Sequence, residues 1–502
     1  MIGRKVILQI ITRLLSSALA FIALFFISRY FEPDVYGTII WSLSFVAIFN
    51  VISDLGLNSA HVKRVSEGLD INDCLSTFLV GKLFLTGLMA VLVLSSLFVW
   101  ISLLGNQLPE SSMEIVFIFV LFYVMVDLAQ IAIMTFDARL QTAKSQLSYF
   151  FDPLIRVPFV IIIAVNGLSD VHLAYAYLLG ATGFAIASLL ILSRDNISWK
   201  RPNLFRSYLS FAFPISTIII MGTLATNVDK LLLGIFWSAD MVGFYAMPQG
   251  ILAIFGIIGA AVTTLAFPAF SKLHSEKNLE AVRKGTVDAE RYISMITLPA
   301  IIVIVIFPLE VATVLLGPNY ADAAGPLRFL SISVFLVLLN GIYSSQINAL
   351  NRPELNARIV FISLIVVVIL LFVLVPENIM GTNLLGMAAT GAAIANMSYF
   401  VTQFISYRIT TQRLTGAGFN TELIKHVLAG IVSGISVIIL SQIMVLNSWI
   451  TLIGYGLGSW AIFAFIIYLL GGLSRKDIAY VMEVINPRKM LRYINDELRG
   501  KE

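Results

Sequence analysis

Long apolar runs separated by short polar segments form the main pattern of this 502-residue chain. Each run approaches the roughly 20 residues that a helix needs to cross the hydrocarbon core of a bilayer. Such a helix satisfies its own backbone hydrogen bonds in lipid, so the pattern predicts membrane-spanning helices. We expect fourteen of them, at 6–28, 37–60, 75–101, 113–136, 147–166, 171–192, 207–236, 241–267, 291–316, 323–350, 357–375, 384–407, 423–446 and 449–471.

Basic residues are concentrated in alternate connections between these runs. The N-terminus, every second connection and the C-terminal tail together hold 27 Lys and Arg residues, whereas the other connections hold only Arg29. Cytoplasmic loops carry the excess of Lys and Arg, so this distribution places both termini in the cytoplasm. The connections on the opposite side reach only about eleven residues, which leaves no room there for a catalytic domain.

One turn sequence occurs twice. Asp34 and Gly37 in RYFEPDVYGTI correspond to Asp240 and Gly243 in WSADMVGFY, at a constant offset of 206 residues. Both copies lie between two apolar runs. Many secondary transporters are built from two related halves, so the repeat predicts two homologous halves in this chain.

Composition agrees with a polytopic membrane protein. The chain is 59% hydrophobic and only 12% charged, whereas a soluble domain carries roughly 25% charged residues. Cys74 is the single cysteine, which excludes an intramolecular disulfide. The sequence has no GxxxxGK[ST] motif, so we do not expect ATP coupling within this chain. We expect no cofactor other than a coupling ion, H⁺ or Na⁺, and no nucleic acid partner.

Several local sequences carry a family resemblance. They are SRYFEPDVYGTIIWSLSF and ISDLGLNSAHVKR in the first half, and FAFPIS, NVDKLLLGIFWSADMVGFYAM and TTLAFPAFSKL in the second. Over about residues 5–470 the chain resembles the Wzx-type polysaccharide flippases. That family belongs to the superfamily that also contains the MATE drug exporters and the lipid II flippase.

The resemblance implies an all-α polytopic membrane protein with fourteen transmembrane helices. Two pseudo-symmetric six-helix lobes, at 1–195 and 196–410, would surround a central cavity. Two additional helices at 411–472 and an amphipathic cytoplasmic tail at 473–502 would follow. It also implies a non-enzymatic protein of a prokaryotic cytoplasmic membrane. Such a protein moves polyprenyl-diphosphate-linked oligosaccharides across the membrane by alternating access, in contact with membrane lipids and other glycan-assembly proteins.

Ionisable side chains inside the apolar runs are the candidate functional residues. In hydrocarbon such groups must face a partner or a wet cavity. Arg and Lys suit an anionic diphosphate, and the candidates for substrate binding are Arg13, Lys82, Arg156, Lys230 and Arg328. The candidates for ion coupling or a polar cavity wall are Asp54, Asp127, Asp229 and Asn227.

Each basic candidate also has a structural interpretation. Arg13 shares a small, polar helix face with Ser17, so it suits a cavity wall, but a buried ion pair would explain it too. Lys82 lies close enough to the inner boundary to extend its ammonium group to the lipid headgroups. Arg328 lies near the outer end of its helix and could simply mark the interface.

The acidic candidates have alternatives as well. Asp54 could bind a coupling ion or cap a helix end, and Asp127 shares a face with Tyr123 and Gln130. Asp152 and Arg156 are spaced as a favourable i, i+4 pair. Asp152 also precedes a proline, as the N-cap of a helix with proline in its first turn would.

Asp229 and Lys230 are adjacent in the sequence and therefore point about 100° apart on a helix. We expect one of them to face the cavity while the other pairs with the opposite lobe. Asn227 shares the face of Lys230.

Two other functions remain open at this stage. A cation-coupled multidrug exporter of the same superfamily would favour an acidic cavity, whereas the basic residues inside the runs slightly outnumber the acidic ones. A membrane-embedded glycan polymerase or ligase would act on similar substrates, but such enzymes carry a sizeable outer loop or domain.

Overall fold

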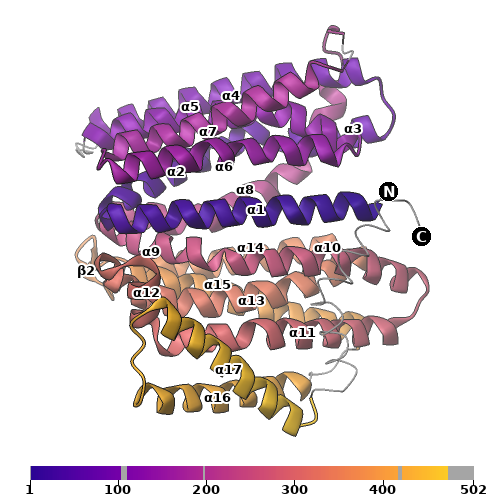
Figure 1. The fold of residues 1–502 in the computed structure, drawn as a ribbon. Helices are drawn as coiled ribbons and strands as arrows, with labels where there is room; N and C mark the ends of the chain where they lie inside the picture. The colour runs from indigo at the N-terminus through magenta and orange to yellow at the C-terminus, as the bar shows by residue number, and fades with distance from the viewer. Residues whose placement is uncertain (1, 103–109, 196–197, 417–420, 473–502) are drawn as a thin grey trace. The chain divides into compact units, whose positions relative to one another are not determined.

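The computed structural model describes residues 2–102, 110–195, 198–416 and 421–472, mostly as α-helices (Figure 1). The expected amphipathic tail at 473–502 lies outside the described residues. Within the described part of the chain, twelve helices are long and apolar enough to cross a membrane. The chain forms two compact units. The N-terminal unit comprises Leu8–Met247 and Leu371–Ala389, and the C-terminal unit comprises the other described residues.

Helices account for almost all of the N-terminal unit, with one short hairpin near the end of its second segment. The bounds of its elements, including two that continue into the other unit (α1 and α9), are α1 Ile2–Tyr30, α2 Pro33–Asp54, α3 Leu57–Ser66, α4 Ile71–Ser102, α5 Glu110–Ala138, α6 Thr142–Val165, α7 Asp170–Leu192, α8 Phe205–Phe236, α9 Ala239–Leu252, β1 Asn378–Ile379 and β2 Thr382–Asn383.

The described part of the C-terminal unit is helical throughout. The bounds of its elements, including two that continue into the other unit (α14 and α15), are α10 Ile254–Ser275, α11 Leu279–Ile306, α12 Pro308–Leu316, η1 Pro318–Ala323, α13 Ala324–Ala349, α14 Pro353–Leu374, α15 Ala388–Thr415, α16 Thr421–Ser441 and α17 Trp449–Leu469.

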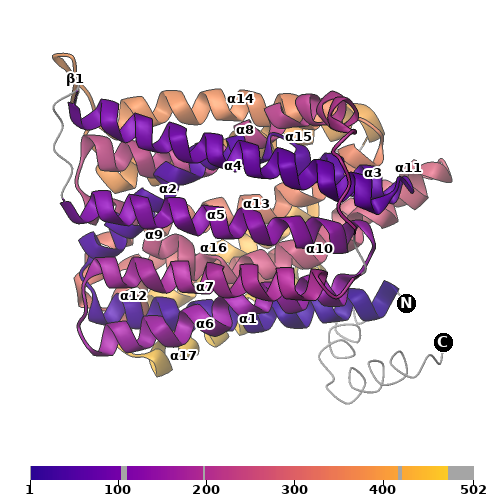
Figure 2. The same cartoon turned by 90° about the horizontal axis from the view of Figure 1, so that it is seen from above.

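In the N-terminal unit, α7 packs along both α5 and α6, and the three helices lie side by side in two views (Figure 1, Figure 2). Gly180 and Gly183 on α7 permit the close approach of α6. A Cβ at Gly180 would lie 2.5 Å from the Oδ1 atom of Asp152, and one at Gly183 would lie 2.1 Å from Ile155. Small residues at helix contacts are typical of membrane bundles.

Helix α8 packs against α2 and α3 and therefore belongs to the N-terminal unit. The compact units consequently divide at Met247, whereas we expected the lobes to divide near residue 195. Gly56, at the start of α3, has a φ of +87°, and a Cβ there would lie 2.5 Å from the carbonyl oxygen of Ala212 on α8. Only glycine satisfies both conditions without strain.

The repeated turn forms a reciprocal contact inside the N-terminal unit. Helices α2 and α9 begin at Pro33 and Ala239, which are separated by the same 206 residues as the repeat. A Cβ at Gly37 would lie 1.6 Å from the Ala239 oxygen, and one at Gly243 would lie 2.0 Å from the Pro33 oxygen. Each copy of the turn thus packs its glycine on the first residue of the other helix.

Two expected spans are interrupted. The range 241–267 is divided between α9 and α10 at Ala253, and the range 291–316 ends with α11 at Ile306, before Pro308 begins α12. Proline lacks the amide hydrogen that a helix interior needs, which explains the second break. The charged segment 271–291 was expected to be helical, and it contains the first three turns of α11.

In the C-terminal unit, α16 packs against α11 and α17. Gly430 and Gly434 on α16, spaced as in GxxxG, meet the side chains of Ile302 and Ile306. The separation expected at 447–448 is longer in the structure, because α16 ends at Ser441 and α17 begins at Trp449. Ser448 is the N-cap of α17 and forms a capping box with Thr451, which begins the last span.

Candidate functional site

A charged pair lies on α6 in the middle of the N-terminal unit. The Nη2 atom of Arg156 donates to the Oδ2 atom of Asp152 at 2.9 Å, as the i, i+4 spacing predicted. The guanidinium carbon of Arg156 lies 4.9 Å from the centre of the Tyr177 ring on α7. The expected N-cap role of Asp152 is wrong, because α6 already begins at Thr142 and Pro153 is inside the helix.

This pair borders a cavity of about 270 Å³. The cavity is lined by α2, α5, α6 and α7, near the middle of each helix. Its lining combines aromatic rings with the two charged groups and comprises Leu43, Phe122, Val126, Tyr149, Asp152, Arg156, Tyr177, Ala181 and Phe184. We call it the Arg156 cavity.

Arg13 is exposed near the start of the apolar part of α1. No hydrogen bond or ion pair of Arg13 is found among the described residues, so the buried ion pair considered from the sequence is absent there. Its positive charge acts on the hydroxyl group of Tyr149, which lines the Arg156 cavity. Arg13 and the cavity therefore lie in the same region of the N-terminal unit.

On α8, Asp229 and Lys230 pair with each other, which corrects the expectation that they would have separate partners. The Nζ atom of Lys230 lies 3.2 Å from Asp229 Oδ1 and also donates to the Thr226 carbonyl at 2.6 Å. The long lysine side chain folds back along the helix and so reaches Asp229, although adjacent helix positions point about 100° apart. Tyr245 on α9 donates to Asp229 Oδ2 at 2.5 Å.

Asn227 and Asp54 both bond to backbone groups. The side-chain amide of Asn227 donates to the Thr223 carbonyl one turn earlier, at 2.9 Å. The Oδ1 atom of Asp54 accepts from the backbone amide of Asn58 at 2.9 Å, in the first turn of α3. The structure therefore provides the helix-capping role that was one of the two interpretations of Asp54.

Lys82 and Asp127 form a buried ion pair between α4 and α5. The Nζ atom of Lys82 lies 2.9 Å from Asp127 Oδ1, and the side chains are 1% and 2% exposed. The hydroxyl of Thr86 donates to the other carboxylate oxygen at 3.1 Å. Lys82 therefore does not extend to the headgroups, because its charge is compensated inside the unit.

Arg328 lies in the C-terminal unit, exposed near the start of α13. Its Nε atom donates to the carbonyl of Val305 at 3.0 Å, in the last turn of α11. A cation at a helix C-terminus compensates carbonyl groups that lack a partner in the helix.

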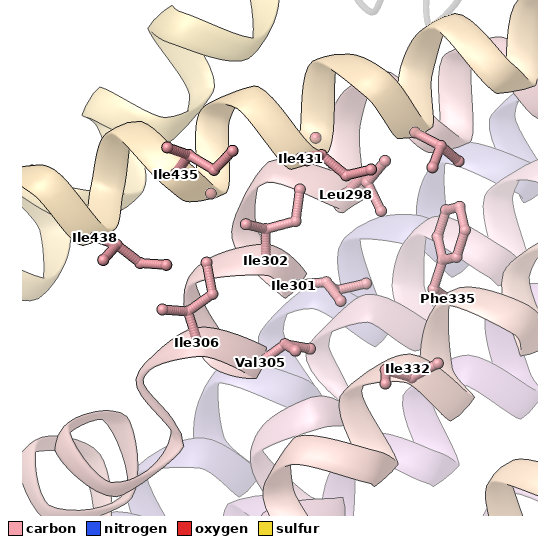
Figure 3. Close-up of a pocket in the computed structure, with 13 residues that line it drawn as sticks. Leu298, Ile301, Ile302, Val305, Ile306, Ile332, Phe335, Ile431, Ile435 and Ile438 are labelled. Atoms are coloured by element: carbon pink, nitrogen blue, oxygen red, sulfur yellow. The ribbon is translucent and has the colours of Figure 1, made fainter.

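A second cavity, of about 350 Å³, lies beside this turn in the C-terminal unit. Figure 3 shows Ile431 and Ile435 of α16 on one side and Ile302 and Ile306 of α11 on the other. We call it the apolar cavity. All its lining residues are apolar: Leu298, Ile301, Ile302, Val305, Ile306, Ile332, Phe335, Val427, Gly430, Ile431, Gly434, Ile435 and Ile438.

The C-terminal unit contains a buried polar cluster that the sequence did not indicate. Glu290, on α11, is fully buried and accepts from Tyr343 of α13 at 2.5 Å and from Arg408 of α15 at 2.9 Å. We had assigned Glu290 and Arg408 to cytoplasmic connections. Each lies inside a longer helix than expected, and nothing in the sequence indicated that they pair across 118 residues.

His61 packs inside the N-terminal unit. Its ring is buried on α3, with Nδ1 2.9 Å from the Tyr208 hydroxyl and Nε2 3.0 Å from the Thr135 hydroxyl. It stacks on Phe78 at 4.2 Å between ring centres. These contacts connect α3, α4, α5 and α8, so His61 serves packing in the N-terminal unit.

Outside the membrane-spanning segments, Lys200 connects the segment before α8 to the start of α4. Its Nζ atom lies 3.2 Å from Asp70 and 3.4 Å from Asp73. The Asp70 carboxylate also accepts from the backbone amides of Asp73 and Asn72. Together these contacts lower the pKa of Asp70, and the hydrogen bond from the Asp73 amide has the largest effect. The hydrogen bond to Asp70 raises the pKa of Lys200.

The N-terminal unit thus brings together Arg13 and the Arg156 cavity, while Lys82 and Lys230 are compensated by neighbouring carboxylates. In the part of the chain that the structure describes, no group of three or more His, Cys, Asp and Glu side chains could hold a metal ion. Among the described residues, the chemistry on offer is recognition: Arg13 as a cation on a membrane-spanning helix, a polar cavity with aromatic walls and an apolar cavity.

Known proteins are similar to this chain in sequence and in fold. Residues 26–325 match the family described as polysaccharide biosynthesis protein. The chain is 21% identical over 456 residues to the probable low-salt glycan biosynthesis flippase Agl15 of Haloferax volcanii, covering 88% of this chain and 93% of that protein.

Solved structures give the same picture of the fold. It is similar to the lipid II flippase MurJ in its inward closed conformation, with a TM-score of 0.75 and 12% identity, over 92% of this chain and 99% of that chain. A multidrug resistance MATE family transporter of the MOP superfamily, in its inward-facing conformation, gives a TM-score of 0.63 and 15% identity, over 80% and 96% of the two chains. The chain is therefore a polytopic membrane protein with the fold of these transporters, and it belongs to the polysaccharide biosynthesis protein family.

Proposed function

We propose that this protein is a flippase for lipid-linked oligosaccharides. It carries a polyprenyl-diphosphate-linked glycan from the cytoplasmic to the outer leaflet by alternating access, coupled to a gradient of H⁺ or Na⁺. The single observation that carries the proposal is Arg13, a cation on a membrane-spanning helix that has no partner among the described residues. An uncompensated cation at such a site suits an anionic ligand.

The substrate's diphosphate matches Arg13. A guanidinium group can bind two diphosphate oxygens at once, which assigns the diphosphate to Arg13. Lys230 would join Arg13 only by leaving Asp229, so we assign it a secondary role.

The exporter alternative has less support. A cationic drug would need an available carboxylate in the membrane-spanning region. Asp127 is paired with Lys82, Asp152 with Arg156, Asp229 with Lys230, and Glu290 with Arg408. Each of these acids would have to give up its partner before it could bind a cation.

We also infer the setting from the sequence and the family. The distribution of Lys and Arg supports both termini in the cytoplasm, and the flippase relative in Haloferax volcanii supports the cytoplasmic membrane of a prokaryote. The partners would be membrane lipids, the lipid-linked glycan and the proteins that assemble the glycan before and after its transfer.

Replacing Arg13 tests this function. Arg13→Ala should reduce glycan export about tenfold or more, because a hydrogen bond to a charged group contributes about 1.5–3 kcal/mol. Arg13→Lys should keep part of the activity, since it keeps the charge but loses the two-pronged geometry. Protein yield and thermal stability should stay normal. Arg352→Ala, which removes an exposed surface cation, is the control.

The measurement is surface glycan, together with lipid-linked precursor, in cells that depend on each variant. Precursor should accumulate on the cytoplasmic side when the gene is deleted and when Arg13→Ala replaces it. Normal export by Arg13→Ala would refute the role of Arg13. A deletion that changes only sensitivity to cationic drugs would favour the exporter.

A further inference from the structure

We propose that the Arg156 cavity is a sugar subsite, which holds the monosaccharide attached directly to the lipid diphosphate. The inference rests on the proposed function and makes it more specific. In this proposal α6 and α7 recognise the first sugar, while Arg13 binds the diphosphate.

The size of the cavity suits one sugar ring. At about 30 Å³ for each water molecule in the liquid, a cavity of about 270 Å³ has room for roughly nine waters. A single sugar ring with its hydroxyl groups can occupy that space.

The walls match the two kinds of surface on a sugar. The faces of the ring carry C–H groups, and aromatic side chains cover such faces. Tyr149 and Phe184 stack on each other at 5.3 Å between ring centres, and Tyr177 lies under the Arg156 guanidinium. A few polar groups placed in a mostly aromatic and apolar wall are typical of small-ligand sites.

The polar groups match the hydroxyl groups at the edge of the ring. A hydroxyl both donates and accepts, and here a carboxylate and a guanidinium stand 2.9 Å apart. The Nε atom of Arg156 is buried and has no hydrogen-bond partner within the described part of the chain. A buried donor in this state indicates a missing acceptor, which a sugar hydroxyl would provide.

The position relative to Arg13 connects the subsite to the lipid. The charge of Arg13 acts on the hydroxyl of Tyr149, on the wall of the cavity. A diphosphate on Arg13 and a sugar in the cavity would then lie in the same region of the N-terminal unit. Gly180 keeps this wall in place, because any side chain there would collide with Asp152 and Arg156.

Binding to the purified full-length protein in detergent tests the subsite. The probes are polyprenyl diphosphate alone and the same lipid carrying one glucose, galactose, mannose, N-acetylglucosamine or glucuronic acid. Wild type should bind at least one sugar-bearing probe about tenfold or more tightly than the bare lipid, as a charge-assisted hydrogen bond provides. Asp152→Asn combined with Arg156→Gln should abolish this preference and leave affinity for the bare lipid within about twofold.

Two further variants protect the test against simple misfolding. The double variant removes both charges together, so neither remains buried alone. Tyr177→Phe keeps the ring and should weaken the preference only in part. Arg139→Gln, which removes a cation paired with Asp195 outside the cavity, should keep the full preference. Binding is compared only among variants whose melting temperature is close to that of wild type.

The outcomes separate the two proposals. If wild type prefers a sugar-bearing probe and the double variant keeps that preference, the subsite is refuted while the flippase remains. Equal binding of all probes by wild type refutes the subsite as well. If neither the bare lipid nor any sugar-bearing probe binds wild type, the proposed function itself fails. If the double variant instead loses affinity for the bare lipid, the cavity binds the diphosphate and the sugar assignment is wrong.

Discussion

Replacing Lys82 with methionine should destabilise the N-terminal unit strongly. Methionine is close to lysine in length but has no charge, so the change removes the ammonium group without opening a large cavity. Asp127 would then remain 2% exposed, with the Thr86 hydroxyl as its remaining hydrogen-bond donor in the described structure. The Thr86 bond exists before and after the change, so it does not offset the loss.

Breaking a buried pair by removing one partner costs about 3–5 kcal/mol, because the other charge stays buried without compensation. That range lowers the folding equilibrium constant by about two to four orders of magnitude. Adding Asp127→Leu should recover most of the lost stability, since apolar residues of similar volume replace a buried pair at little cost. The matched control is Lys144→Met. Its pair with Asp195 is partly exposed, so the change should cost about 1 kcal/mol or less.

The assay is equilibrium unfolding of the purified protein in mixed micelles, with glycan export measured in parallel. The structural interpretation requires stability to fall in Lys82→Met and to return in the double variant, together with export. A stable Lys82→Met variant that exports nothing, and a double variant that is equally inactive, would refute this reasoning. Lys82 would then act on the substrate, as the sequence alone allowed.

Two further predictions follow from close contacts. Gly243→Ala should destabilise the protein by about 1–3 kcal/mol, because its Cβ would lie 2.0 Å from the Pro33 oxygen. Gly222→Ala on α8, where nothing lies within 4 Å, should be nearly neutral in the same unfolding assay. Below about pH 4, protonation of Asp70 should weaken its contact with Lys200 and leave Asp73 as the other carboxylate near it, because a lowered pKa makes the Asp70 contact stabilising only above that range. Hydrogen exchange at the amides of Asn72 and Asp73, which donate to the Asp70 carboxylate, should then lose protection, and Asp70→Asn should remove this pH dependence.

The positions of most spans could be predicted, because hydropathy records burial in lipid directly. The two interruptions, at Ala253 and before Pro308, could not be predicted. Ala253 lies inside a continuous apolar run, and a change of helix direction leaves hydropathy unchanged. Glu290 was placed in a connection because it follows six other charged residues within fifteen positions, whereas α11 extends through that segment and buries it.

Only the charged residues of the candidate site could be predicted from the sequence. Arg13 and Arg156 stood out as cations in apolar runs, and the Asp152–Arg156 pair followed from helical spacing. Tyr149 and Tyr177 carried no such signal, because aromatic residues are common throughout membrane helices. The cavity depends on where α6 and α7 meet, and that depends on glycines whose contacts lie on another helix.

The contact between the two turns is self-complementary. Gly37 rests on Ala239, and Gly243 rests on Pro33, so one local surface serves as both sides of the contact. Self-complementarity of this kind is what a two-fold homodimer requires. Here both sides belong to one chain, so a side chain at either glycine would push the starts of both α2 and α9 apart.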